Sequence, residues 1–179
     1  TGLFIADALR EKAGAQIGLC LVGTTHCGMV GRIYKGDICA ADIASLSLSV
    51  GTTSGDPNDK KLWKVSMTGA ELTKLLRDAT AFAPNDNVPN IPYYVASGLK
   101  IKFAPWKADK LVSVTLADGS RLDPDQTYTV ALWGWPFAAA CPGTVEQVYE
   151  DSCDDILTAA VKSAGTVRPD NDERFTVTY

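Results

Sequence analysis

Helical patterns stand at the two ends of this chain, and segments with the pattern of β-strands lie between them. Residues 3–13 place Phe4, Ala8 and Leu9 on one face of an amphipathic helix. The last predicted helix covers residues 154–164. Strands are expected at residues 17–22, 62–67, 93–103 (interrupted at Ser97 and Gly98), 111–116, 127–132 and 175–179. Because strands and helices do not alternate strictly, the order predicts an α+β domain rather than a series of βαβ units.

Two further segments carry local signals. Thr68 is followed three residues later by Glu71, which is the spacing of a capping box and predicts a helix over residues 69–80. Residues 39–44 are expected to form a short helical piece. Residues 45–50 alternate as Ser-Leu-Ser-Leu-Ser-Val, which predicts a strand with one polar face.

Length and charge limit the classes of protein. The chain has 179 residues and no internal repeat or linker, which predicts a single domain over residues 1–179. Its 17 basic and 21 acidic residues give a net charge of −4, and the sequence has no Lys/Arg block. This argues against a protein that coats nucleic acid or an anionic membrane. The apolar runs fall short of the roughly 20 residues of a membrane span. A single histidine, His26, excludes most multi-histidine metal sites and disfavours self-contained hydrolysis.

The five cysteines form no CxxC pair, so neither a zinc ribbon nor a thioredoxin-type motif is present. Cys141 and Cys153 bracket a short segment that a disulfide would close, with a stabilisation of about 3 kcal/mol in the loop-entropy model. Cys27 and Cys39 are the second candidate pair, which leaves Cys20 as the odd one. The alternative is five reduced and mostly buried thiols.

Other catalytic patterns are weak. His26 and Cys27 are adjacent, and neighbouring residues of an extended chain point to opposite sides, so they do not form a nucleophile–base pair readily. Ser97 lacks the G-x-S-x-G elbow. No Walker A or G-x-G-x-x-G motif occurs, and the acidic clusters lack the spacing of a calcium loop.

Several segments carry a family pattern in a fixed order. They are GLFIADALREKAGAQIGLCLVG (residues 2–23), KGDI (35–38), VSMTGAEL (65–72), VASGLK (95–100), the stretch from residue 111 to YTV at 128–130, and residues 167–175 with Arg174. Together they resemble the C-terminal domain of the 5'-nucleotidase family, and the resemblance covers nearly the whole chain. It implies a layered α/β/β/α arrangement.

The resemblance also implies a division of labour. In that family the C-terminal domain supplies the nucleotide pocket, and an N-terminal metallophosphoesterase domain binds two divalent metals and activates water. One histidine is too few for a two-metal site, so the metal-binding half is expected to be absent from this chain and the chain alone is expected to be non-catalytic. The family is generally exported, which implies an extracytoplasmic location and favours the Cys141–Cys153 disulfide.

The pocket residues of the family are only partly present. The family's asparagine after the first strand falls on Gly23, and Arg32 stands near its arginine with a displaced register. Ser49 replaces the first base-stacking aromatic and has no π-face. Trp135 keeps the second aromatic, while Gly134 replaces the neighbouring asparagine. A solvent-facing role for Arg32 is the alternative to phosphate binding.

Trp133, Trp135 and Phe137 fall on one face of an extended segment, which fits either a ligand wall or a piece of core. Two functions follow from the resemblance. The first is the substrate-recognition domain of an exported nucleotide phosphohydrolase, with Trp135, Arg32, Phe137 and Gly23 as candidate ligand contacts. The second is a diverged cell-surface binding or structural module that kept the fold and lost the nucleotide pocket.

Overall fold

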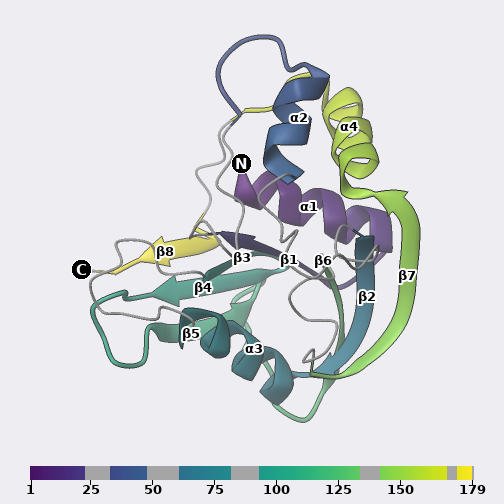
Figure 1. Cartoon of the computed structure of the whole chain (residues 1–179). Coiled ribbons are helices and arrows are strands. Elements are labelled where there is room, and N and C mark those ends of the chain that lie inside the picture. The colour runs from purple at the N-terminus through teal and green to yellow at the C-terminus, as the bar shows by residue number, and fades with distance from the viewer. Residues whose placement is uncertain (23–32, 48–60, 82–92, 134–141, 169–172, 179) are drawn as a thin grey trace.

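The computed structural model of the chain describes residues 1–22, 33–47, 61–81, 93–133, 142–168 and 173–178. These residues form four helices and two β-sheets (Figure 1). The elements in chain order are α1 Gly2–Ala13, β1 Ile17–Val22, α2 Ala40–Ser47, β2 Lys61–Thr68, α3 Gly69–Ala81, β3 Tyr93–Ser97, β4 Leu99–Phe103, β5 Leu111–Leu116, β6 Thr127–Trp133, β7 Thr144–Ser152, α4 Cys153–Ala164 and β8 Phe175–Val177. The predicted α+β class is confirmed.

The larger sheet has the strand order β3-β1-β6-β2-β7. Its strands β1 and β6 pair in parallel, with Ile17 opposite Val130. The other three pairs are antiparallel, and Val22 lies opposite Tyr93 where β1 pairs with β3. The smaller sheet has the order β5-β4-β8, and β8 runs parallel to β4.

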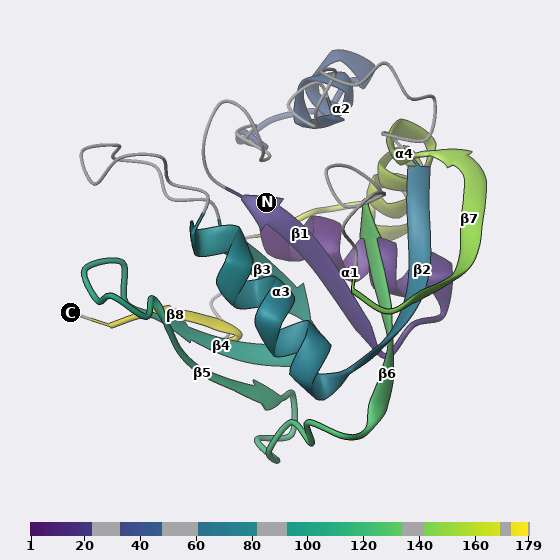
Figure 2. The same cartoon turned by 60° about the horizontal axis from the view of Figure 1, so that its bottom comes forward.

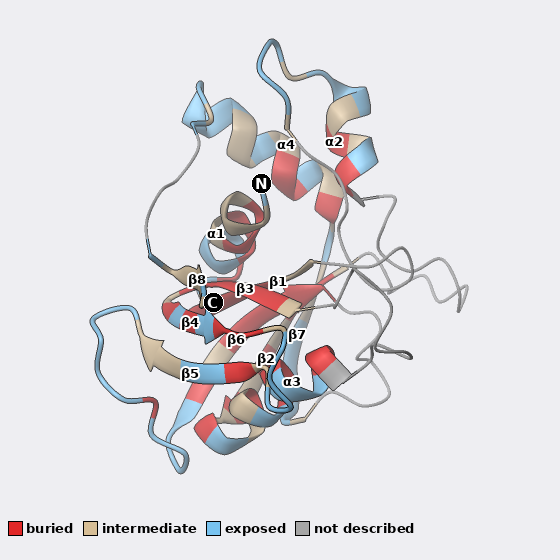
Figure 3. Cartoon of the chain, turned by 90° about the vertical axis from the view of Figure 1, so that its left-hand side faces the viewer, coloured by how far each residue is buried: buried red, intermediate tan, exposed pale blue. Residues whose placement is uncertain are grey.

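Helices α1, α2 and α4 lie on one side of the larger sheet, where α1 packs on the strands and α4 packs on both α1 and α2 (Figures 1 and 3). Ile5 and Leu9 of α1 are fully buried in the core between these helices and the sheet. Gly18 of β1 allows the close approach of α1, because a Cβ at that position would collide with the carbonyl oxygen of Ala6 and with Cβ of Arg10. The helix therefore lies directly on the first strand.

Helix α3 and the smaller sheet cover the opposite face (Figure 2). The core on this side includes Leu72 and Leu76 of α3 together with Leu99 and Ile101 of β4. The pattern of β4 alternates between buried and exposed residues, so its lysines face solvent while its apolar residues face the core.

The predicted capping box at the start of α3 is confirmed. The amide N–H of Thr68 donates to Oε2 of Glu71 at 2.8 Å, and the amide N–H of Glu71 donates to Oγ1 of Thr68 at 3.2 Å. Helix α4 begins in the same way, since the amide of Asp155 donates to the Ser152 hydroxyl at 3.2 Å. Neither this second box nor the strand before it was expected from the sequence.

The strand predicted over residues 45–50 is wrong for the part that the structure describes, because α2 continues through Ser47. The reason is packing: Ile43 and Leu46, three residues apart on one helix face, are both buried against the α1–α4 side of the core. The Ser45 hydroxyl also donates to the carbonyl oxygen of Asp42 at 2.7 Å, which satisfies it within the helix. Within the described residues, no helix is long and apolar enough to cross a membrane.

Candidate functional site

The candidate site lies where strands of the larger sheet end side by side. The parallel strands β1 and β6 finish at Val22 and Trp133, and the antiparallel strands β2 and β3 begin at Lys61 and Tyr93. Val22 pairs with Tyr93, and Trp133 pairs with Leu62. These four positions, Val22, Lys61, Tyr93 and Trp133, are called the rim below. In open sheets, ligands commonly bind outside the carboxyl ends of parallel strands.

The sequence-predicted ligand contacts follow directly after two rim residues. Gly23 is the next residue after Val22, and Trp135 comes two residues after Trp133. All four candidates, namely Gly23, Arg32, Trp135 and Phe137, lie outside the described residues, so their contacts stay predictions. The structure shows where the two segments that contain these candidates begin, because they follow β1 and β6, which are neighbouring, hydrogen-bonded strands.

Trp133 belongs to the core. Its side chain is 7% exposed and packs in the cluster of α1, α2 and α4, so the alternative that this residue is part of the core is confirmed. Trp135 and Phe137, the other members of the predicted stripe, lie outside the described residues.

Two buried indole groups near the rim have no hydrogen-bond acceptor among the described residues. Trp63 and Trp133 are 9% and 7% exposed, and among the described residues no group accepts from either Nε1–H. Trp63 lies in the core on the α3 side and Trp133 in the core on the α1 side, so the two rings face opposite sides of the sheet. A buried donor without an acceptor costs about 1–3 kcal/mol, which makes both N–H groups available to a water or a ligand.

Tyr93 gives the rim an aromatic surface. Its ring stacks on Phe175 with centroids 4.8 Å apart and planes 15° from parallel, and Phe103 lies 5.2 Å away. Burial of the phenol raises the pKa of Tyr93 above its ordinary value, so the hydroxyl is a neutral donor near pH 7. Sequence reasoning missed this residue, because nothing in the motif pattern marks a tyrosine at the start of that strand.

Two carboxylates of this part of the fold have fixed partners. Nζ of Lys61, at the rim, lies 2.9 Å from Oε2 of Glu150 on β7. At the start of α2, the backbone N–H of Cys39 donates to Oδ2 of Asp42 at 2.8 Å. This hydrogen bond, together with one from the Cys39 thiol, holds the pKa of Asp42 below its usual range. Asp42 is therefore ionised at neutral pH.

The described residues do not fit a metal site. Among them, no three His, Cys, Asp or Glu side chains stand close enough to hold an ion. A two-metal centre requires several such ligands around ions a few ångströms apart. No catalytic step through a metal is therefore derived from these residues.

The cysteines lie in different surroundings. Cys20 and Cys153 are buried, and Cys39 is exposed. Burial raises the pKa of the Cys20 thiol to about 12. Cys141 lies outside the described residues, so the Cys141–Cys153 disulfide stays a prediction. The segment between these two cysteines contains β7, an extended strand of nine residues that the sequence did not predict.

Comparison with known proteins gives the family. The model of the 5'-nucleotidase C-terminal domain matches residues 1–143. The chain belongs to this family. The matched residues include the four rim positions and the segments that follow β1 and β6.

Solved structures show the same fold. The chain is similar to a 5'-nucleotidase precursor from Thermus thermophilus, with a TM-score of 0.72 and 18% identity over 98% of this chain and 34% of that one. It is similar to the NAD nucleotidase of Haemophilus influenzae, with a TM-score of 0.63 and 18% identity over 98% of this chain and 32% of that one. A third is the sulfate thiohydrolase SoxB of Thermus thermophilus, with a TM-score of 0.68 and 17% identity over 97% of this chain and 31% of that one.

The three structures carry different activities in their names, so the shared fold does not select a substrate. The chain spans about a third of the length of each of them. No curated protein sequence matches the chain. The 5'-nucleotidase C-terminal domain is thus the part of the longer proteins to which this chain corresponds.

Proposed function

We propose that this chain is the substrate-recognition domain of a 5'-nucleotidase-like phosphohydrolase and that it binds the nucleoside part of a nucleotide at the rim. The observation that supports the proposal is the parallel pairing of β1 with β6. Because of this pairing, the segments that contain the candidate contacts, one after β1 and one after β6, begin at neighbouring strand ends. A flat base needs aromatic surface and a phosphate needs cationic donors. Trp135 and Phe137 are the aromatic residues, and Arg32 is the cationic residue, in the segments that follow β6 and β1.

Each candidate contact has a distinct role in this proposal. Trp135 stacks on the base, with Phe137 as a second apolar wall, and such stacking contributes about 1–3 kcal/mol per base. Arg32 donates to phosphate with its forked guanidinium group. Gly23 leaves room for the ligand close to the backbone. The orphaned indole N–H of Trp133 is a further donor near the same strand end.

The chemical step belongs to a separate domain in this proposal. An N-terminal metallophosphoesterase domain, in the same longer chain or as a partner, would hold two divalent metals and activate water for phosphate hydrolysis. In this division of labour, the present chain would contribute binding and orientation of the substrate. An extracytoplasmic location is part of the proposal and rests on the family.

The second candidate function is a binding or structural module that has lost the nucleotide. The observation that favours it is the sequence of the pocket itself. Ser49 and Gly134 stand where the family has a phenylalanine and an asparagine, and Ala139, Ala140 and Cys141 replace its Gly-Gly-Asp. Losing a stacking ring and two polar contacts removes several kcal/mol of ligand binding.

A tryptophan-fluorescence titration with adenosine and AMP, supported by calorimetry, separates the two functions. Trp63 and Trp133 lie in strands that reach the rim, and Trp135 comes two residues after Trp133 in the sequence. Their fluorescence is therefore expected to change when a base binds at the rim. Saturable quenching at micromolar to low-millimolar ligand supports nucleotide binding. Trp135→Ala is expected to weaken it about tenfold or more, in line with the loss of one stacking contact. Trp106→Ala, at an exposed tryptophan in the turn between β4 and β5, is the matched control. A flat titration of the folded chain would favour the module without a nucleotide.

A further inference from the structure

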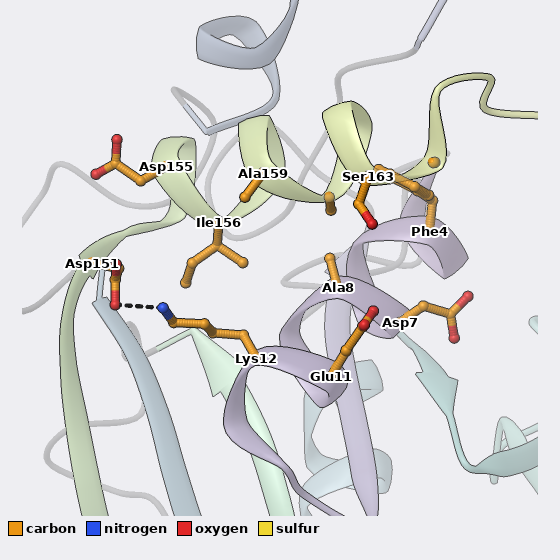
Figure 4. A pocket seen from close by; sticks show the side chains of 12 residues that line it. Phe4, Asp7, Ala8, Glu11, Lys12, Asp151, Asp155, Ile156, Ala159 and Ser163 are labelled. Atoms are coloured by element: carbon orange, nitrogen blue, oxygen red, sulfur yellow. Dashed lines mark ion pairs between the residues drawn. The ribbon is translucent and has the colours of Figure 1, made fainter.

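A groove of about 450 Å³ runs between α1 and α4, on the outer side of the helices that cover the larger sheet (Figure 4). Its floor is apolar, with the small side chains of Ala8 from α1 and Ala159 from α4 beside the larger Ile156 of α4. Figure 4 shows the two helices side by side, with Lys12 and Asp151 at one end and Phe4 and Ser163 at the other. None of the residues proposed as nucleotide contacts lines this groove.

The spacing of the lining residues fits a helical occupant. On α4 they stand at Ile156, Ala159, Ala160 and Ser163, which is the i, i+3, i+4, i+7 stripe of one helix face. The stripe from residue 156 to residue 164 is about 12 Å long at 1.5 Å per residue, or between two and three turns. Alanine at its centre lets another helix axis approach to about 8–10 Å. Two such helices with a groove between them are the arrangement that receives an amphipathic helix.

The charge of the groove selects the occupant. Four carboxylates line it, from Asp7, Glu11, Asp151 and Asp155, against the single ammonium of Lys12. Lys12 is already paired with Asp151 at 2.8 Å, and Asp7 is paired with a residue outside the groove. In the part of the chain that the structure describes, no ion pair neutralises Glu11 or Asp155. These two acids stand on opposite walls, one on each helix.

We infer that the α1–α4 groove is a docking site for a basic amphipathic helix of a partner protein. The apolar face of the incoming helix, two to three turns long, covers Phe4, Ala8 and Ala159. Its lysines or arginines flank that face and meet Glu11 on one wall and Asp155 on the other. This site is separate from nucleotide binding, so it stands whether or not the rim binds a nucleotide.

The test uses a synthetic peptide with a fluorescent label. The peptide has about 14 residues, with leucines at i, i+3, i+4 and i+7, lysines on both flanks and alanines elsewhere. A second peptide replaces every lysine with glutamate. Fluorescence anisotropy is measured at about 0.15 M salt, where attraction between distant exposed charges is largely screened. The expected result is saturable binding of the lysine peptide and none of the glutamate peptide.

Variants locate the binding. Ala159→Arg fills the exposed centre of the groove with a positive charge that repels the lysine peptide, and Glu11→Lys reverses the charge on the α1 wall. Each variant is expected to bind the lysine peptide about tenfold more weakly or worse. Glu173→Lys makes the same charge change at an exposed position outside the groove and is expected to leave binding unchanged. Equal loss with Glu173→Lys, equal binding of the two peptides, or no saturable binding of the lysine peptide would each overturn the inference. Both groove positions are exposed, and a circular dichroism spectrum verifies that the variants are folded.

Discussion

The guanidinium group of Arg174 lies 2.6 Å, measured from Nη1, from Oδ1 of Asp7, across 167 positions of sequence. Arg174 stands directly before β8, and Asp7 is in the middle of α1. The side chain of Arg174 is 15% exposed and that of Asp7 is 45% exposed. The pair therefore joins the last strand to the first helix in a setting with little water around the cation.

Removing the acid of this pair is expected to destabilise the fold. Asp7→Ala removes the carboxylate that lies against Nη1 of the largely buried guanidinium group, and we expect the free energy of unfolding to fall by about 1–3 kcal/mol. Denaturant titration measures this change. Asp78→Ala breaks the exposed pair with Lys74 on α3 and is expected to cost less than about 1 kcal/mol. Equal losses of unfolding free energy in the two variants would contradict the conclusion that the Asp7–Arg174 pair stabilises the fold more than the exposed Lys74–Asp78 pair.

The indole N–H of Trp133 is expected to add nothing to the stability of the protein without ligand. Trp133→Phe keeps an aromatic ring in the core and removes a buried donor that no described residue satisfies. We expect the free energy of unfolding to change by less than about 1 kcal/mol, whereas Trp133→Ala removes the ring and costs about 3–5 kcal/mol. A loss of about 2 kcal/mol or more in the phenylalanine variant would mean that the N–H has an acceptor in the free protein.

Gly18 is expected to tolerate no side chain. A methyl group there meets the backbone of α1 at Ala6, so Gly18→Ala must push the helix away from β1 and is expected to cost about 1–3 kcal/mol or more. Gly14→Ala is the control, because nothing lies within 4 Å of its added Cβ and only its left-handed backbone (φ 54°, ψ 39°) is unfavourable. The control is expected to cost about 1 kcal/mol. Thermal and denaturant unfolding of both variants tests the difference.

The thiols of Cys20 and Cys39 are expected to react at different rates. Burial raises the pKa of Cys20 to about 12, so its thiol stays protonated and shielded at about pH 8, while Cys39 is exposed. Iodoacetamide followed by peptide mass spectrometry should modify Cys39 and leave Cys20 intact in the folded protein. Since the pKa is raised in the folded state, the protonated thiol supports folding fully below the unfolded pKa. This support is lost as the pH rises from the unfolded value towards 12. Rapid labelling of Cys20 under these conditions without unfolding would contradict the burial.

The disulfide between Cys141 and Cys153 is tested by mass spectrometry of the protein digested without reduction. The cross-linked peptide is the expected product. Its formation requires Cα atoms within about 7 Å, whereas a straight strand of about eight steps such as β7 would span about 26 Å. Figure 1 shows β7 strongly bowed, which shortens that span. Five free thiols would show that the cysteines are not paired.

Local signals predicted the elements that have buried apolar faces. The bounds of β1 and β5 agree with the sequence patterns, and α1 and α3 differ by a residue at their ends. Strand β7 was missed because most of its residues are exposed at the edge of the sheet and its sequence carries no clear apolar alternation. The serines and leucines from residue 45 alternate like a strand, but Leu46 is needed in the core and the helix prevails.

The candidate site was predictable in its residue types and not in its assembly. That β1 and β6 are neighbours is a pairing over more than a hundred residues, and no local pattern contains it. Tyr93 lies at the rim because it pairs with Val22. The indole N–H of Trp63 is buried with no acceptor among the described residues because β2 lies between β6 and β7. These contacts depend on tertiary packing, which a single sequence does not show.

The contacts of residues 174–177 with α1 and β4 have a consequence for synthesis. Strand β8 pairs with β4, and Arg174 reaches α1, so these contacts form only after residues 174–177 have left the ribosome. Pairings of such large sequence separation carry a large loop-closure entropy and make folding slow. During that interval the surfaces later covered by β8, including Phe103, are open to other chains. At this stage the nascent chain exposes apolar surface of the kind that holding chaperones bind, until residues 175–177 have been synthesised.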